Sequence, residues 1–421
     1  MVFNKNIKNA TWIIGEQIFQ MVLSLVVGIL SARYLGPSNY GSLNYTASFV
    51  SFFSAIATLG MEGVVIKKMI AKPEKEGEYL GSCILYRLIS SFLSSIAILI
   101  IIAILNPDDT VKLVLAALQT IQLLFQSFYI LNAWFQRYLN SKYISMAKMV
   151  SCVIVYSYKI YLLVTAKSIE WFAFSNSLSY IIIGIVLYLF YKKEKGQILK
   201  VNLKMGNEVL KDSYHFILSG LMVAIYGQID KIMIGEMMTD ADVGYYTTAA
   251  ALCAMWIFVP NAIINSFRPT IMEYKEKKME IEYLRKLKQL YSFLIWLCIF
   301  VSVCVFALGG IAIKILYGVS YMPAAAPLKI LIWSELFSVM GTARGIWVLS
   351  ENKNKYVKYY LCIGAVVNIV LNAAMIPLYG VEGAAVATLI TQIVTCVIAP
   401  MFYKETRVHS KILFEAFHFK W

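Results

Sequence analysis

The sequence predicts an all-α polytopic membrane protein with about 12 transmembrane helices in two six-helix lobes. Three observations predict this class. First, 60% of the 421 residues are apolar and 15% are charged, whereas soluble domains average about 45–50% and about 25%. Second, long apolar runs recur along the whole chain. Third, Lys and Arg concentrate in alternate connecting segments. Together these observations exclude a soluble multi-domain protein.

The apolar runs are long enough to cross a bilayer as helices, which takes roughly 20 residues each. A membrane β-barrel would instead show alternation over segments of about ten residues. The first six runs lie near 11–35, 41–66, 80–105, 111–135, 144–166 and 169–191. The second six lie near 214–237, 243–267, 289–312, 328–349, 359–378 and 383–403. An even number of spans predicts that both termini lie on one side of the membrane.

The distribution of basic residues predicts which side that is. The termini and the loops on their side contain 29 Lys and Arg, the opposite loops contain 4, and the remaining 5 of 38 lie within spans. Cytoplasmic loops of membrane proteins carry this excess, so both termini are predicted to be cytoplasmic. The net charge of +14 is then explained by topology, and no nucleic-acid partner is needed.

The spans divide into two equal halves at the longest inner loop, about 192–213. At an offset of 203 residues, Gly41 matches Gly244 and Ala47 matches Ala250, and each pair opens an even-numbered span. We therefore expect a duplicated six-helix unit, with parallel repeats about an axis along the membrane normal. The predicted domains are residues 1–200, residues 201–405, and a cytoplasmic tail, 406–421, that could form an interfacial helix. Residues 273–289 fit either an interfacial helix or a solvated loop.

Charged and polar side chains follow one face of the first span and of the seventh. Charges within a bilayer are costly and usually face a polar interior. Glu16 and Gln20 lead the stripe in the first span, and Tyr226 and Asp230 belong to the one in the seventh. Packing between helices through small and polar groups is one interpretation. A water-filled cleft between two lobes is the other, and we prefer it because corresponding helices carry a carboxylate.

The depths of the cations within the spans indicate what kind of head group such a cleft would hold. Arg87 lies about 10 Å into its span at 1.5 Å per residue, and Arg344 reaches the same level from the tenth span. Lys159 and Lys231 lie toward the outer half, and Arg33 lies near an outer end. Such a cationic cavity suits a phosphate or diphosphate head group. Asp230 is expected to face Lys159 or Arg33, or to bind a coupling cation.

No cofactor or metal site is predicted. The seven cysteines are odd in number, form no CxxC and lie in or beside apolar runs, as small buried residues do. The three histidines show no metal-ligand spacing, and the phosphate-binding pattern GxxxxGK[ST] does not occur. The sequence therefore predicts neither catalytic residues nor ATP hydrolysis by this chain.

Four segments carry a resemblance to a known family. They are ARYLGPSNYGSLNYTAS at 32–48, AWFQRYLNSKYIS at 133–145, QIDKIMIG at 228–235 running into VGYYTTAA at 243–250, and VVNIVLNAAMIPLYGVEGAAVATLI at 366–390. The chain resembles polysaccharide (O-antigen-type, lipid-linked oligosaccharide) flippases of the multidrug/oligosaccharidyl-lipid/polysaccharide exporter superfamily. The resemblance covers essentially the whole chain.

The resemblance implies two lobes around a central cavity that alternate between inward- and outward-facing states. It implies a cargo of undecaprenyl-diphosphate-linked oligosaccharide in the bacterial cytoplasmic membrane, coupling to H⁺ or Na⁺, no enzyme activity, and polysaccharide polymerase and chain-length proteins as partners. Cationic cavity residues are a family theme at variable positions, so Arg33, Arg87, Lys159, Lys231 and Arg344 rest on depth alone. A peptidoglycan-precursor flippase, a multidrug exporter and a membrane glycan polymerase or acyltransferase remain alternatives.

Overall fold

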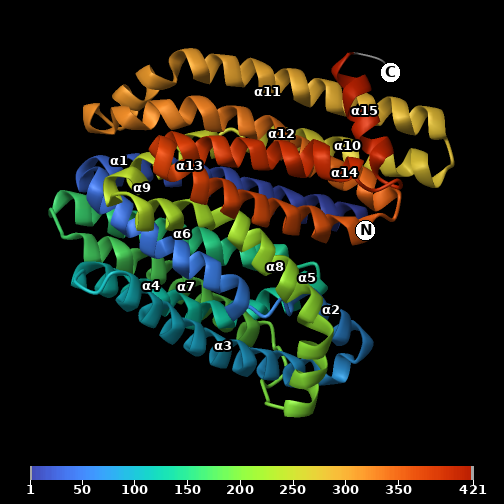
Figure 1. Ribbon diagram of the computed structural model, residues 1–421. Helices are drawn as coiled ribbons and strands as arrows, with labels where there is room; N and C mark the ends of the chain where they lie inside the picture. The colour runs from blue at the N-terminus through green and yellow to red at the C-terminus, as the bar shows by residue number, and fades with distance from the viewer. Residues whose placement is uncertain (1, 419–421) are drawn as a thin grey trace. The chain divides into compact units, whose positions relative to one another are not determined.

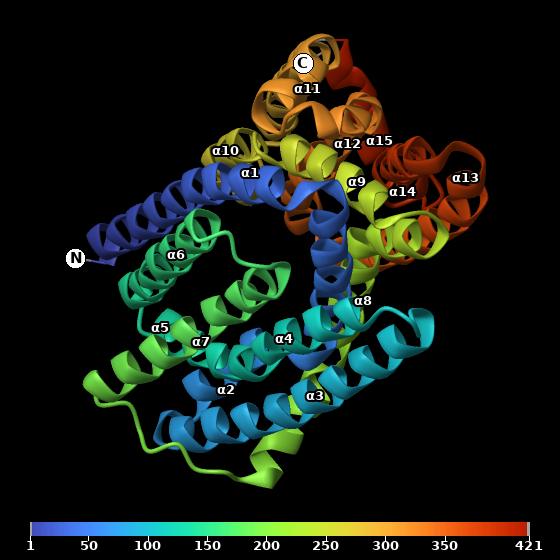
Figure 2. The same cartoon turned by 90° about the vertical axis from the view of Figure 1, so that its left-hand side faces the viewer.

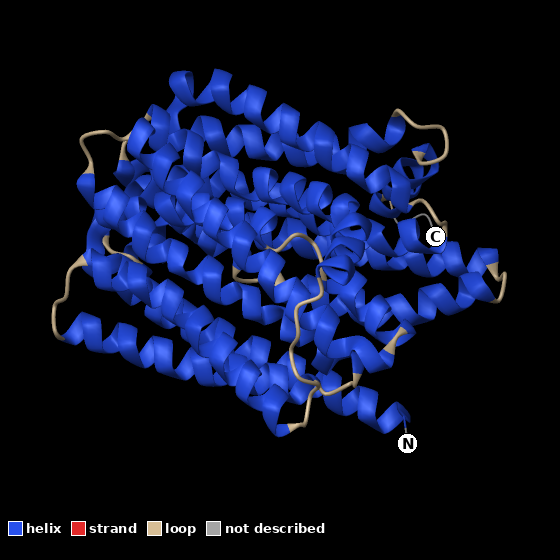
Figure 3. Cartoon of the chain, turned by 90° about the horizontal axis from the view of Figure 1, so that it is seen from below, coloured by secondary structure: helices blue, strands red, loops and turns tan. Residues whose placement is uncertain are grey.

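The computed structural model describes residues 2–418, with side chains from residue 15 onward. Within that range the chain is helical, with short loops and no strand (Figure 3). It forms two compact units, Met1–Ala224 and Ile225–Trp421, here called the N-terminal and C-terminal units. The division falls inside one long helix, α8 (Leu203–Met237). The predicted boundary near residue 200 between duplicated halves stays a prediction.

Ten helical stretches in the described chain are long and apolar enough to cross a membrane. Two of them are too long for one crossing: Gly15–Ala71 has 57 residues and Asn354–Met401 has 48. At 1.5 Å per residue they would reach roughly 85 and 72 Å, against a hydrocarbon core of about 30 Å. Each therefore contains two spans, and ten stretches give twelve spans. The predicted fold class is confirmed.

Glycines turn the chain inside both long stretches. In α1 (Val2–Ala57), Gly36 has φ 73° and ψ 169°, and Pro37 opens the second half. Positive φ is accessible to Gly because it lacks a Cβ, and Pro is tolerated in a first helical turn because no N–H is needed there. Figure 2 shows the two halves of α1 running in different directions. Gly380, with φ 60° and ψ −137°, divides α13 (Val357–Ile393) in the same way.

The N-terminal unit continues from α1 through six further helices. They are α2 (Glu62–Ala71), α3 (Glu76–Leu105), α4 (Thr110–Gln126), α5 (Asn132–Arg137), α6 (Ser141–Val164) and α7 (Ile169–Lys193). A 3₁₀ turn at Ser127–Leu131 joins α4 to α5. The second predicted span, 41–66, is too long: Leu59 and Gly60 both have positive φ, which ends α1 and starts α2 as a separate helix.

The AWFQRYL segment fastens one end of the N-terminal unit. Glu76, at the start of α3, is buried. Its carboxylate accepts hydrogen bonds from Trp134 Nε1 and Tyr138 Oη, both at 2.8 Å, and it pairs with Arg137. A buried carboxylate is tolerated when several donors satisfy it. This motif therefore holds the α5 region against α3.

The C-terminal unit contains the last part of α8, from Ile225 to Met237, and seven later helices. They are α9 (Asp240–Ala254), α10 (Phe258–Glu276), α11 (Glu280–Leu316), α12 (Ala325–Ser350), α13, α14 (Ala399–Met401) and α15 (Arg407–Phe417) (Figure 1). A π-helical turn at Val394–Ile398 separates α13 from α14. The predicted tail lies largely in α15, and residues 419–421 of it lie outside the described chain. Residues 273–289 belong to the ends of α10 and α11.

Candidate functional site

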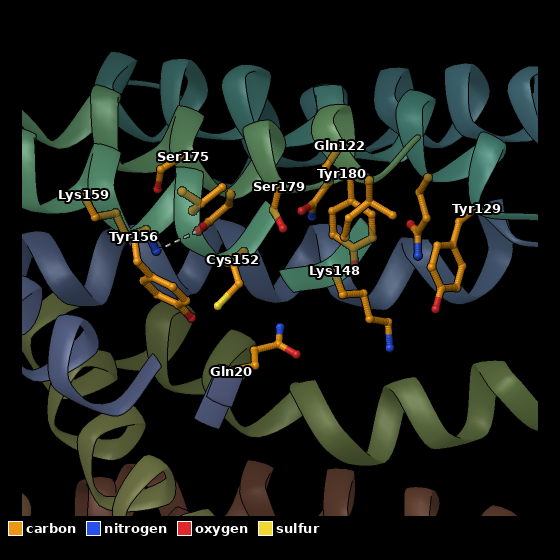
Figure 4. A pocket seen from close by; sticks show the side chains of 15 residues that line it. Gln20, Gln122, Tyr129, Lys148, Cys152, Tyr156, Lys159, Ser175, Ser179 and Tyr180 are labelled. Carbon is orange, nitrogen blue, oxygen red and sulfur yellow. Dashed lines mark hydrogen bonds between the residues drawn. The ribbon is translucent and has the colours of Figure 1, made fainter. Parts of the chain in front are cut away.

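A polar cavity of about 520 Å³ lies in the N-terminal unit, between α1, α4, α6 and α7 (Figure 4). Eleven of its fifteen lining residues carry a hydroxyl, amide or ammonium group. Polar groups at membrane depth are costly, so a cavity that gathers them is a candidate functional site. The polar lining residues are Gln20, Gln122, Gln126, Tyr129, Lys148, Tyr156, Lys159, Ser175, Asn176, Ser179 and Tyr180.

One face of α6 provides both cations of this cavity. Lys148, Cys152, Tyr156 and Lys159 recur at intervals of three or four residues and all line the cavity. Side chains at this spacing share one face of an α-helix. Figure 4 shows the ammonium groups of Lys148 and Lys159 separated along α6, with Tyr156 and Cys152 between them. The helix therefore presents two positive charges to one cavity at different depths.

The two lysines have different partners. Lys148 Nζ lies 3.8 Å from a carboxylate oxygen of Glu16, whose residue is 3% exposed. Lys159 Nζ lies 3.5 Å from Asn176 Oδ1 and 5.8 Å from the centre of the Tyr156 ring. The lining residues include two lysines and no carboxylate. The wall is therefore cationic, with the single Glu16 charge placed behind one lysine.

The structure brings some of the predicted site residues in this unit to the cavity and leaves others apart. Gln20 and Lys159 line it, and Glu16 contacts it through Lys148. Arg87 is buried in α3, where it interacts electrostatically with Glu62, and it does not line the cavity. Arg33 is exposed on α1 and is not part of the wall.

A second buried polar cluster surrounds Asp230 in the C-terminal unit. Tyr246 Oη and Thr388 Oγ1 donate hydrogen bonds to Asp230 Oδ2 at 2.6 and 2.8 Å, and Asn372 Nδ2 donates to Oδ1 at 2.6 Å. Asn372 Nδ2 also lies 3.3 Å from Asn368 Oδ1. All three donors to the carboxylate are neutral. The cluster therefore contains a buried carboxylate surrounded by amide and hydroxyl oxygens.

The other predicted residues of this unit lie around that cluster without joining its hydrogen bonds. Lys231 Nζ is 3.4 Å from Gln228 Oε1 on its own helix. Tyr226 lies on α8 beside Gly364 of α13. Asp230 and Lys231 are neighbours on α8 and have separate hydrogen-bond partners.

Arg344 has a different environment from the one that its depth suggested. Its Nη1 donates hydrogen bonds to the carbonyl oxygens of Thr395 and Cys396 at 2.8 and 3.4 Å. Its guanidinium also lies 4.6 Å from the centre of the Tyr360 ring. A π-helical turn interrupts the regular backbone hydrogen bonding of a helix. The guanidinium compensates for that interruption, which indicates a structural role for Arg344.

Sequence reasoning missed Lys148 and the partners of Asp230. The count of basic residues places Lys148 in a cytoplasmic loop, although the predicted span near 144–166 already includes it. In the structure it lies on α6 (Ser141–Val164) and lines the cavity. Its spacing of 11 residues from Lys159, three helical turns, is the signal that could have found it. Tyr246 and Asn372 both lie within the family-like segments, so those segments contained the relevant side chains without showing that they meet.

The fold and its two polar clusters define a class: a polytopic helical membrane protein built to hold polar groups within a bilayer. Residues 7–275 match the family described as "Polysaccharide biosynthesis protein", and the chain belongs to that family. It is thus a polysaccharide-flippase member of the multidrug/oligosaccharidyl-lipid/polysaccharide exporter superfamily, as the sequence motifs predict.

The proteins similar to the chain include two named relatives and two solved structures. A probable low-salt glycan biosynthesis flippase (Agl15) of Haloferax volcanii is 24% identical over 377 residues, which cover 87% of this chain and 77% of the relative. The Lipid II flippase MurJ of Bacillus subtilis is 25% identical over 48% of this chain and 42% of its own. A structure of Lipid II flippase MurJ in an inward closed conformation has a TM-score of 0.75 at 15% identity, covering 97% of this chain and 90% of that one.

The second structure is an inward-facing multidrug resistance transporter of the MATE family. It has a TM-score of 0.71 at 13% identity and covers 94% of this chain and 96% of that one. At these identities the structural likeness establishes the shared fold.

Proposed function

We propose that this protein moves undecaprenyl-diphosphate-linked oligosaccharide units from the inner to the outer leaflet of a bacterial cytoplasmic membrane. It does so by alternating access, with both termini cytoplasmic, and it supplies surface polysaccharide biosynthesis. The cationic cavity of the N-terminal unit is the observation that carries this proposal. Membership of the polysaccharide family supports the same cargo class.

The lining of the cavity suits both parts of such a head group. Lys148 and Lys159 each offer an ammonium group to the diphosphate at a different depth of the cavity, and charge-assisted bonds of this kind are about twice as strong as neutral ones. Gln20, Gln122 and Asn176 offer amides to sugar hydroxyls, and all of them line the same cavity. A cationic wall disfavours the cationic compounds that a multidrug exporter would carry, because like charges repel.

The two flippase relatives, which act on different cargoes, match different shares of this chain. The glycan-flippase relative matches 87% of the chain, whereas the Lipid II flippase matches 48%. We therefore favour a glycan repeat unit over a peptidoglycan precursor. Polysaccharide polymerase and chain-length proteins are the partners that this role implies. Arg33, Arg87 and Lys231 stay predictions as cargo-binding residues.

We further propose that Asp230 couples transport to an H⁺ or Na⁺ gradient. Its carboxylate has three neutral donors in the C-terminal unit, and the oxygens of Thr388, Asn368 and Asn372 lie around it. Carboxylate, hydroxyl and amide oxygens are hard donors that suit Na⁺, and a proton can occupy the carboxylate instead. Glu16, held near Lys148, is the second candidate for this role.

A flipping assay in proteoliposomes tests the cargo proposal. The double variant Lys148→Gln with Lys159→Gln should move a lipid-linked oligosaccharide at least about tenfold more slowly, because a bond to a charged group contributes about 1.5–3 kcal/mol. Lys167→Gln, which removes an exposed lysine outside the cavity, is the matched control and should transport normally. Flipping of the double variant at the wild-type rate would refute the assignment of this cavity. A parallel arm with Lipid II separates the two cargo classes.

A further inference from the structure

The last helix of the described chain, α15, has the placement of a helix at a membrane surface. Figure 1 shows α15 crossing the axis of α11 at a steep angle. Since α11 contains a membrane span, a helix that crosses it in this way lies in the plane of the membrane. Two contacts hold it there: His409 Nε2 lies 3.0 Å from Tyr291 Oη, and Lys288 pairs with Glu415 at 2.7 Å.

The two faces of α15 differ in composition. Ile412, Leu413 and Ala416 are buried in a hydrophobic cluster that includes residues of α11. The outward face carries the exposed side chains of Arg407, Val408, Lys411 and Phe414. Mixed basic and apolar residues on one face are typical of helices that lie among lipid head groups.

A groove of about 590 Å³ runs along this outward face. Its lining includes three cations, Lys404, Arg407 and Lys411, together with apolar side chains such as Val408 and Phe414. Val408 is 55% exposed and Phe414 is 52% exposed. The groove thus combines positive charge with apolar surface that is left uncovered by the protein.

The three cations are poorly neutralised by the residues that the structure describes. Lys404 has no carboxylate within ion-pair distance there. Arg407 donates its Nε hydrogen to the Met401 carbonyl oxygen at 3.1 Å and pairs with no described carboxylate. Lys411 lies 3.9 Å from Glu415, which Lys288 holds more closely at 2.7 Å. The groove therefore keeps an excess of positive charge.

We propose that this groove binds the head group of an anionic phospholipid in the leaflet on the side of the C-terminus. The phosphate lies against Lys404, Arg407 and Lys411, and the upper acyl chain covers Val408 and Phe414. Charge complementarity selects the occupant, because a zwitterionic head group brings a cation of its own to the three side chains. An anionic lipid thereby fastens α15 to the membrane surface beside the last span.

Native mass spectrometry of the full-length protein in neutral detergent tests this proposal. The probes are dioleoyl phosphatidylglycerol and dioleoyl phosphatidylcholine at equal concentration. The wild-type protein should retain phosphatidylglycerol preferentially. Each of Lys404→Gln, Arg407→Gln and Lys411→Gln should weaken that preference up to about fivefold, which is the ~1 kcal/mol that a basic residue gains near an anionic lipid surface.

The matched control is the triple variant Lys277→Gln, Lys278→Gln and Lys286→Gln, which removes three positive charges outside the groove. It should bind phosphatidylglycerol as the wild type does. Equal retention of the two lipids by the wild type, or equal losses in the control and the groove variants, would overturn the proposal. So would full displacement of the lipid by millimolar inorganic phosphate, because the groove would then be a general anion site. The three groove residues are exposed, so single substitutions leave the fold available for the measurement.

Discussion

Replacing Asp230 with Asn is the substitution that separates stability from ion coupling most sharply. The amide has nearly the shape of the carboxylate but no charge. Its oxygen can accept from Asn372, and its NH₂ group can donate to the oxygens of Tyr246 and Thr388, because hydroxyl groups both donate and accept. The three hydrogen bonds, at 2.6, 2.6 and 2.8 Å, therefore have neutral replacements. We expect the variant to fold.

The loss of the charge has a larger effect on a bound cation than on the fold. Exchanging charge-assisted bonds for neutral ones costs about 1 kcal/mol each, and part of that cost is recovered because no charge is buried. In contrast, a unit charge about 4 Å from a cation contributes roughly 4 kcal/mol at an effective dielectric constant of about 20. Its removal corresponds to a loss of about a thousandfold in cation affinity.

The measurement is transport of a lipid-linked oligosaccharide in proteoliposomes, with and without an imposed H⁺ or Na⁺ gradient. Asp230→Asn should remove the stimulation by the gradient while the melting temperature falls by only a few degrees. Glu335→Gln is the matched comparison, because Glu335 is another carboxylate within a span of the same unit. If Asp230→Asn kept its gradient dependence, or Glu335→Gln alone lost it, the assignment of Asp230 would be wrong.

Three further outcomes follow from the C-terminal unit. Arg344→Ala should lower the free energy of unfolding by about 3 kcal/mol, because it removes the hydrogen bonds to two carbonyls of the π-helical turn and the contact with Tyr360. Chemical denaturation in detergent measures this loss, and an unchanged midpoint would contradict the prediction. Burial holds the pKa of His409 well below its usual value and nearby Arg344 lowers it further. Protonation of His409 therefore favours the unfolded chain, and the free energy of unfolding should fall below pH ~6.5 by up to ~1.4 kcal/mol per pH unit. His409→Gln should flatten this pH dependence, and equal slopes in the wild type and the variant would refute the reasoning. Gly383→Ala should destabilise by about 1–3 kcal/mol, because its Cβ would collide with the backbone carbonyl of Met375, which lies before the turn at Gly380. Gly341→Ala meets open space and should not destabilise, so equal melting temperatures of the two variants would count against this packing.

Most of the fold could be predicted because its signals are local. Apolar runs of about 20 residues identify spans one by one, and the bilayer forces each of them into a helix. The turns at Gly36 and Gly380 are consistent with this reading, since they divide two long helices where the apolar pattern expected separate spans. The predicted ends of the spans were less accurate. The second span was expected to continue to residue 66, but α1 ends before Leu59 and Gly60, whose positive φ is decided by packing rather than by hydropathy.

The candidate sites could be predicted only in part, because depth along a span says nothing about direction around the bundle. Lys159 and Arg344 both lie far enough along their spans to suggest a cavity. One lines it, and the other is turned toward the π-helical turn in a different unit. Lys148 is the opposite case: the count of basic residues placed it in a loop, and the rotation of α6 turns its side chain toward the cavity.

The sequence by itself determined the class of protein, the number of spans and the family, because hydropathy and short motifs are carried by neighbouring residues. Only the tertiary structure decided that Asp230 meets Tyr246, Asn372 and Thr388, and that α6 offers two lysines to one cavity. Those contacts join residues up to 158 positions apart. The rotation and packing of whole helices set them, and no local pattern in the chain records that rotation.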